Sequence, residues 1–246
     1  MTKSLLLLLL ASGTGGILFA AQGPRHDAPM RSAPHPTAAG ANHAPVLVEL
    51  YQSQGCSSCP PANANLNAIA DRPDVVALSF GVTYWDQLGW KDSFASPQYT
   101  ARQWDYARFN HRENVATPQM WINGRQTIVG GNGGQLAAII RQANSTGPTI
   151  SFGANGVEIG SGAIPRARVA VWLARYDPHT VQVAIRAGEN GGRTLPHKNI
   201  VKSLVIIGRW TGQAAHFRLP KAAPGLASAV FLQAGSGGPV LAVAKG

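Results

Sequence analysis

The chain has 246 residues, of which 45% are hydrophobic and only 13% are charged, and its formal net charge is +10. This composition favours a folded protein of one large or two ordinary domains and excludes disorder over the whole length. No basic cluster interleaved with aromatic residues occurs, which argues against nucleic-acid binding.

The chain begins with a pattern typical of a secretory signal peptide over residues 1–22. Lys3 precedes an apolar run that starts at Leu5, and small residues follow from Ala20. The end of this run gives no clear cleavage point, so an uncleaved membrane anchor is the alternative. Residues 23–44 are rich in Ala, Pro and His, which predicts a flexible linker. A periplasmic or secreted location is therefore expected.

The first folded segment predicts a β-α-β unit. Residues 46–51, VLVELY, form an apolar run typical of a strand buried on both faces. PPANANLNAIA follows the cysteines with helical spacing, and its prolines suit a first helical turn. Residues 74–82, DVVALSFGV, predict a second buried strand parallel to the first. Cys56 and Cys59 therefore lie at a junction between a strand and a helix.

An insert, a hairpin and a helix complete the expected fold up to residue 146. The insert begins TYWDQLGWKDSF and holds a predicted helix over residues 97–109. Residues 117–131, TPQMWINGRQTIVGG, contain Asn-Gly between two apolar segments, which is a strong signal for a β-hairpin. Residues 135–143, QLAAIIRQA, have the apolar period of an amphipathic helix.

The sequence changes in character beyond Gly147. Short segments of alternating apolar and polar residues, such as RVAVWLARY and TVQVAIRA, are separated by Gly, Pro and Asn. This pattern predicts an antiparallel, sandwich-like β domain of roughly five to eight strands over residues 147–246. Lys and Arg outnumber Asp and Glu there by eleven to three. This surplus favours either a solvated basic face or contact with an anionic membrane surface or partner.

Cys56 and Cys59 are the only cysteines in the chain. A disulfide between them would close too short a loop to constrain the unfolded chain, so a structural role explains the pair poorly. At the start of a helix, unpaired amide groups and the helix dipole favour the thiolate and lower the thiol pKa. The spacing therefore indicates thiol-disulfide exchange, with Cys56 as the exposed nucleophile and Cys59 as the resolving thiol.

Longer motifs resemble a known superfamily. VLVELYQSQGCSSC, and Thr117–Pro118 followed by MWINGRQTIVGG, resemble the active-site and cis-proline segments of thioredoxins over residues 45–146. CSSCPPA, YWDQLGWKDSFASPQYTARQ, TPQMWINGR and GENGGRTLPHKNIV together resemble an uncharacterised family of secreted bacterial thioredoxin-like proteins. The resemblance implies an α/β thioredoxin-like domain, with a central mixed sheet flanked by helices, followed by an antiparallel β-rich C-terminal domain.

The resemblance also implies roles for single residues. Cys56 would be the nucleophile and Cys59 the resolving thiol. Pro118 would be the cis-proline beside them, and Thr117 would offer its backbone to an extended substrate. Glu49 would correspond to the buried acid that moves protons to and from the resolving cysteine. Glu49 lies seven residues before Cys56, one more than in typical thioredoxins, so the side on which its carboxylate projects is open. A Glu at a strand edge that reaches solvent is the alternative.

Other residues are candidates for contact with a substrate or partner. Ser57 and Ser58 would donate hydrogen bonds to the thiolate of Cys56 and so favour the reduced form. In the aromatic insert, Trp85 and Trp90 would form a substrate platform, and ordinary packing is the alternative reading.

The polar residues Glu189, Arg193 and His197 lie close together in a Gly-rich connection of the second half. Loops carry function more often than strand interiors do. These side chains would contact the first half or a partner, and a hairpin with internal hydrogen bonds is the alternative.

Three functions remain open from the sequence. The favoured hypothesis is a periplasmic thiol-disulfide oxidoreductase that acts on exported proteins or small thiols, together with a redox partner protein, and needs no cofactor or metal. The second is handling of Cu(I), which soft thiolates select, with His111 as the candidate third ligand. The third is a non-catalytic envelope binding module that uses the basic second half.

Overall fold

The computed structural model describes residues 44–143, 145 and 147–246. The predicted signal peptide, and all of the predicted linker except its last residue, lie outside this part. Within it, no helix is both long and apolar enough to cross a membrane.

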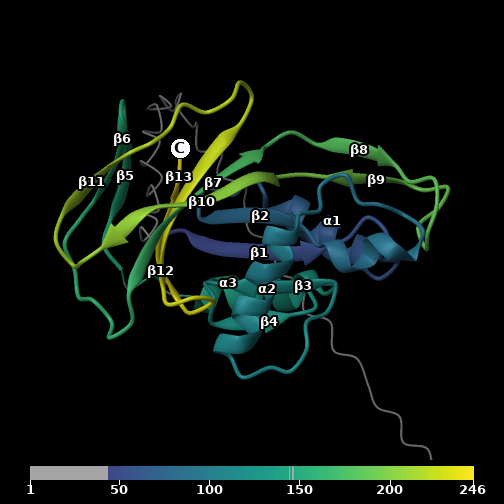
Figure 1. Ribbon diagram of the computed structural model, residues 1–246, viewed down its shortest axis with the longest axis horizontal. Coiled ribbons are helices and arrows are strands. Elements are labelled where there is room, and N and C mark those ends of the chain that lie inside the picture. Colours follow the sequence, from purple (N-terminus) through teal and green to yellow (C-terminus); the bar gives the residue numbers. More distant parts are fainter. Residues whose placement is uncertain (1–43, 144, 146) are drawn as a thin grey trace, which may run out of the picture. The chain divides into compact units, whose positions relative to one another are not determined.

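The predicted β-α-β unit is present. Strand β1 (Val46–Gln52) leads through the cysteine segment into helix α1 (Cys59–Ile69), and strand β2 (Val75–Gly81) then pairs with β1 in parallel. All side chains of both strands are buried, as their continuous apolar runs require. This arrangement presents the first turn of α1 at the end of a rigid strand (Figure 1).

The insert and the hairpin follow the predicted order. A short 3-10 helix, η1 (Thr83–Leu88), precedes helix α2 (Pro97–Phe109), which begins after Ser96. Strands β3 (Gln119–Ile122) and β4 (Gln126–Ile128) form the predicted hairpin.

At the turn of this hairpin, Asn123 and Gly124 have φ angles of 47° and 62°. This left-handed backbone is what an Asn-Gly turn provides. Helix α3 (Gly133–Gln142) ends the segment.

Nine strands make up the second half of the chain. They are β5 (Ile150–Gly153), β6 (Gly156–Ile159), β7 (Val169–Asp177), β8 (Val181–Ala184), β9 (Thr194–His197), β10 (Ile200–Trp210), β11 (Ala215–Arg218), β12 (Ala227–Ala234) and β13 (Val240–Lys245). Five of these strands, β5, β7, β8, β9 and β11, alternate more buried with less buried residues, as the sequence pattern predicts.

The two halves share one sheet. Its eight strands lie in the order β13-β12-β7-β10-β2-β1-β3-β4, and β10 meets β2 through Ile200 and Ser79. Strands from both sides of the expected boundary therefore belong to one sheet (Figure 1). Strand β2 is buried on both faces, and its free edge would expose unpaired backbone groups, so β10 covers it. The protein is thus a mixed α/β fold with a large central mixed sheet.

Two smaller sheets complete the described part. Strands β11, β6 and β5 form a three-stranded sheet, whose Val157 and Ile159 pack against Val171 and Leu173 of β7. Strands β8 and β9 form a separate hairpin, and β9 lies against α1.

Residues of β1 alternate between the two faces of the central sheet. Val48 and Leu50 pack in one core together with residues of α1 and α3. Leu47 and Tyr51 pack in the other core, with residues of α2. This alternation decides which side chains of β1 can reach the cysteines.

Candidate functional site

The two cysteines lie at the start of α1, immediately after β1. Cys59 is the first residue of the helix, and its N–H group donates to the carbonyl oxygen of Cys56 at 3.1 Å. The N–H group of Cys56 donates to the carbonyl oxygen of Ser53 at 3.1 Å, which closes the turn. Both cysteines are free thiols, and their exposed fractions are only 1% and 2%.

The surroundings of the two thiols shift their pKa values in opposite directions. A hydrogen bond with Cys59 is the main cause that lowers the pKa of Cys56 to about 7, and Thr117 and the amide groups of Ser58 and Cys59 add to it. Burial works against this shift. For Cys59, burial raises the pKa well above its ordinary value. At neutral pH Cys56 is therefore the thiol that ionises.

The segment beside Cys56 contains a cis peptide bond. This bond joins Thr117 to Pro118, as the sequence predicts. The sulfur of Cys56 lies 3.7 Å from the carbonyl oxygen of Thr117. The segment that leads into β3 thus flanks Cys56.

A loop from the second half of the chain binds the cysteine segment. We call residues 188–193, which connect β8 to β9, the rim loop. One carboxylate oxygen of Glu189 accepts the Ser57 N–H at 3.0 Å and the Ser57 hydroxyl at 2.7 Å. These hydrogen bonds lower the pKa of Glu189. Glu189 therefore stays ionised beside the exposed Ser57.

Asn190 fixes the rim loop more firmly than its neighbours do. Its side chain is fully buried, and its Nδ2 atom donates to the carbonyl oxygens of Gln54 and Cys56, both at 2.9 Å. Arg193 donates in turn to Oδ1 of Asn190 at 2.8 Å. Sequence reasoning selected Glu189 and Arg193 but missed Asn190, since an Asn among glycines looks like an ordinary turn residue.

His197 anchors β9 to α1. It is buried, and its Nδ1 atom lies 3.2 Å from Nδ2 of Asn63. Phe94 packs against the imidazole with 5.6 Å between ring centroids. Burial lowers the pKa of His197 to about 4, so the ring is neutral at pH 7. His197 thus contacts α1 and the insert. The sequence predicts such a contact with the first half of the chain.

The aromatic insert reaches the cysteine segment through Trp90. Its indole N–H donates to Oε1 of Gln54 at 2.9 Å, and the N–H of Gln54 donates to Asp92 at 2.8 Å. Burial raises the pKa of Asp92 to about 6. Trp85 instead packs against the core that contains residues of α2, so ordinary packing, the alternative interpretation, applies to it. Ser58 is exposed and contributes its backbone amide to Cys56.

The structure does not bring Glu49 to Cys59. Glu49 is fully buried and accepts from Arg102 at 2.8 and 3.2 Å and from the hydroxyl of Tyr106. Both partners belong to α2. Because Glu49 alternates with Leu50 along β1, its side chain enters the α2 core and not the core beneath α1. The extra residue between Glu49 and Cys56 explains this difference.

Comparison with known proteins places the chain in a family. A family model described as "Protein of unknown function (DUF1223)" matches residues 47–233. The chain belongs to the DUF1223 family. The match includes β1, the cysteine pair, the cis-proline segment and the rim loop. No curated protein matches the chain.

Two solved structures resemble this DUF1223 protein. Protein AGR_C_4864 from Agrobacterium tumefaciens, a structural-genomics target, is 30% identical. The alignment covers 83% of this chain and 95% of that one, with a TM-score of 0.68. HBP35 of Porphyromonas gingivalis is 10% identical over 83% of this chain and 75% of that one, with a TM-score of 0.51. This second likeness concerns the fold alone.

Candidate metal ligands are few around the cysteines of this DUF1223 chain. Among the described residues, no group of three or more His, Cys, Asp or Glu side chains is placed to hold a metal ion. His111, the third ligand considered for Cu(I), is exposed and follows the C-terminal end of α2. The expectation of Cu(I) handling therefore rests on the two thiols.

Proposed function

We propose that this DUF1223 protein is a thioredoxin-like thiol-disulfide oxidoreductase. The observation that carries the proposal is the pair of free thiols at the start of α1, in which the pKa of Cys56 is lowered to about 7 and that of Cys59 is raised. Such a split supplies a thiolate for attack and a protected thiol for resolution. A buried structural pair would gain nothing from an ionisable sulfur.

The reaction, written as reduction of a substrate, has two exchange steps. The thiolate of Cys56 attacks one sulfur of the substrate disulfide, whose S–S bond breaks and whose second sulfur leaves as a thiolate. Cys59 then gives up its proton and attacks the Cys56 sulfur, which releases the first substrate sulfur. The protein ends as the Cys56–Cys59 disulfide. The substrate has gained two electrons, and its two sulfurs take up the proton of Cys59 and one proton from water. Oxidation of a dithiol is the reverse sequence.

The substrate would approach between three segments. The carbonyl oxygen of Thr117 lies next to Cys56, and a backbone acceptor there suits an extended peptide. Glu189 and Trp90 flank the cysteine segment on other sides. We infer that exported proteins or small thiols are the substrates and that a redox partner protein recharges the pair. The periplasmic or secreted location rests on residues 1–22.

Two matched variants test the mechanism. After reaction of each reduced variant with glutathione disulfide, Cys59→Ser should accumulate a mixed disulfide at Cys56, because no resolving thiol remains. Cys56→Ser should form none under the same conditions. Mass spectrometry after acid quenching distinguishes these products. Equal labelling of both variants would overturn the assignment of the nucleophile.

The reduction potential of the wild-type pair tests the function itself. Exchange proteins lie between roughly −270 and −120 mV, and we expect a value in this range from equilibration with glutathione. A value far below about −300 mV would identify a stable structural disulfide and would refute the proposal.

A further inference from the structure

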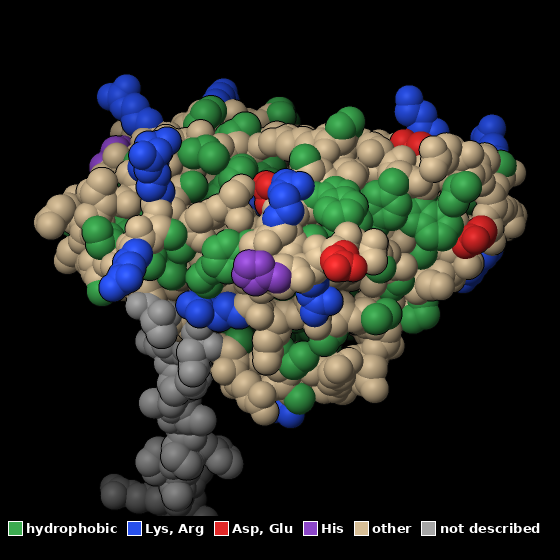
Figure 2. All heavy atoms as spheres, turned by 60° about the horizontal axis from the view of Figure 1, so that its bottom comes forward, with side chains coloured by type: hydrophobic (Ala, Val, Ile, Leu, Met, Phe, Trp, Pro, Cys, Tyr) green, Lys and Arg blue, Asp and Glu red, His purple; other side chains and the backbone are tan. Residues whose placement is uncertain are grey.

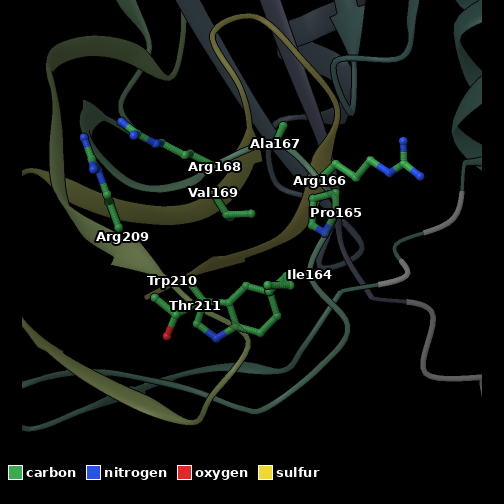
Figure 3. A pocket seen from close by; sticks show the side chains of 9 residues that line it. All are labelled: Ile164, Pro165, Arg166, Ala167, Arg168, Val169, Arg209, Trp210 and Thr211. Carbon is green, nitrogen blue, oxygen red and sulfur yellow. The ribbon is translucent and has the colours of Figure 1, made fainter.

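Two adjoining hollows lie where β7 begins and β10 ends. Figure 3 shows the residues that line the smaller one. One has a volume of 360 Å³ and the other 480 Å³, and Arg168, Val169 and Arg209 line both. We call the combined surface the arginine groove. Neither lining contains a residue of the cysteine segment or the rim loop. Nor does either lining contain an Asp or a Glu.

Two arginines come together at this groove. Arg209 pairs with Ala170 across β10 and β7, and Arg168 precedes Ala170 by two residues, so both side chains project from the same face. Figure 3 shows them running in a similar direction from neighbouring strands, whereas Arg166 points elsewhere. Figure 2 shows basic side chains spread over the face that it draws.

Nothing in the described part of the chain neutralises this pair. Among the described residues, no salt bridge or side-chain hydrogen bond involves Arg168 or Arg209. Arg72, Arg102 and Arg108, in contrast, all pair with acids. Like charges on neighbouring strands repel each other. An anion bound between the two guanidinium groups would remove this repulsion and accept charge-assisted hydrogen bonds from both.

The floor beside the arginines is apolar. Ile206 pairs with Trp172 across the same two strands, and both line the larger hollow with Ala170. Ile206 is 56% exposed, although it belongs to the central sheet. Exposed aliphatic side chains next to a charged cluster are suited to a ligand with an apolar body.

We propose that the arginine groove binds a single-chain anionic amphiphile. Its carboxylate or phosphate head group lies between Arg168 and Arg209, and its apolar chain lies over Trp172 and Ile206. The proposal is independent of the thiol chemistry, because it shares no residue with the cysteine site. It identifies the ligand by chemistry: one compact anionic head and one short hydrocarbon chain.

Titration calorimetry of the full-length protein with defined probes tests this site. Decanoate and decyl phosphate, both kept below their micelle concentrations, should bind. Decyltrimethylammonium, which has the same chain and the opposite charge, should not. Acetate and inorganic phosphate, which lack the chain, should bind far more weakly. Equal binding of the cationic and anionic amphiphiles, or no binding of any amphiphile, would overturn the proposal.

Variants then locate the site. Arg168→Gln/Arg209→Gln should weaken decanoate binding by about tenfold or more, because two charged hydrogen-bond donors are lost. Ile206→Ser should weaken it through loss of apolar contact. Arg218→Gln removes an exposed arginine of β11 outside the groove and is the matched control. All four residues are partly or largely exposed at the surface, and thermal melting verifies that each variant is folded.

A vesicle experiment separates a free amphiphile from a membrane surface. The protein is sedimented with vesicles of phosphatidylglycerol and phosphatidylcholine. Binding of monomeric decanoate that depends on the arginine pair supports the proposal. Arginine-dependent binding to vesicles without binding of decanoate overturns it and makes the groove a membrane contact. Unchanged decanoate binding in the double variant places the ligand elsewhere and also overturns it.

Discussion

Cys56 and Cys59 occupy environments that differ although only two residues separate them. Cys56 receives a hydrogen bond from Cys59 and faces amide groups at the start of α1, and both interactions favour its thiolate. Cys59 is the first residue of α1, and there burial disfavours its charged form. The order of the two thiols in the proposed reaction therefore follows from their different surroundings.

This difference gives a measurable titration. In the reduced protein, the alkylation rate of Cys56 should rise with pH through a midpoint of about 7. An ordinary cysteine titrates near about 8.5. Cys59→Ala should move the midpoint upward, because alanine cannot donate the hydrogen bond that favours the thiolate of Cys56. Alkylation by iodoacetamide followed by mass spectrometry gives both curves. A wild-type midpoint at the ordinary value would contradict the assigned environment.

His197 makes the stability of the fold depend on pH. Its pKa is about 4 in the folded protein because of burial, against about 6.5 in an unfolded chain. The neutral form is therefore favoured by folding. This contribution is fully present above about pH 6.5 and is lost as pH falls through 4, for a total of about 3 kcal/mol.

Asp92 titrates in the opposite sense in the same range. Burial raises its pKa to about 6, so protonation on acidification favours the folded state. Urea unfolding of wild type and His197→Gln at several pH values isolates the contribution of His197, because both proteins contain Asp92 and its contribution cancels. The stability difference between the two proteins should shrink as pH falls from 6.5 to 4. A difference independent of pH would show that His197 does not titrate with unfolding.

At the scale of elements, the hairpin of β8 and β9 connects the second half of the chain to the cysteine segment. Asn190 carries this connection, since it donates to the carbonyl oxygen of Gln54 and gives the carbonyl oxygen of Cys56 a second donor beside the Cys59 N–H. Buried carbonyls without partners are costly. The rim loop is thus part of the cysteine site although it follows Cys56 by more than a hundred residues.

Truncation of Asn190 should therefore loosen the site. We expect Asn190→Ala to lower the free energy of unfolding by about 1–3 kcal/mol and to speed alkylation of Cys56, because the turn loses its support. Gln182→Ala, at an exposed position of the same hairpin, should change stability by less than about 0.5 kcal/mol. Urea unfolding and thiol labelling of both variants provide the comparison. Equal effects of the two substitutions would contradict the role of Asn190.

Local patterns were sufficient for most elements around the cysteines. Apolar runs, the prolines after Cys59 and the Asn123–Gly124 turn each depend on neighbouring residues, and the structure contains the strands, helix and hairpin they predict. The pairing of Ile200 with Ser79 joins segments more than a hundred residues apart. No local pattern encodes that contact, so the sequence did not predict that strands of both halves pair.

At the scale of the whole molecule, a buried polar cluster links the two halves. Arg102 of α2 binds Glu49 of β1 and donates to Oε1 of Gln233 on β12 at 3.0 Å. Its guanidinium also lies 5.0 Å from the ring centroid of Trp172 on β7. Glu49 could be selected from the sequence, because a carboxylate in a buried strand is costly, but its partner Arg102 could not. A shift of one residue along β1 decides which face receives the side chain.

This cluster gives a test of what Glu49 does. Arg102→Met should lower the free energy of unfolding by about 3–5 kcal/mol, because it leaves the carboxylate of Glu49 buried without its partner. The double variant Glu49→Gln/Arg102→Met should recover much of this loss, since no buried charge remains. Chemical unfolding of the two variants and of wild type measures both effects.

The same double variant separates a structural role from proton transfer. If Glu49 only pairs with Arg102, the folded double variant should resolve a mixed disulfide at Cys56 as fast as wild type does. Stopped-flow kinetics with a disulfide probe measures this step. A slow second step in a stable, folded double variant would place Glu49 on the proton path of Cys59 and would contradict the separation of faces in the central sheet. An unchanged rate leaves Glu49 with a structural role, as the buried partner of Arg102 on α2.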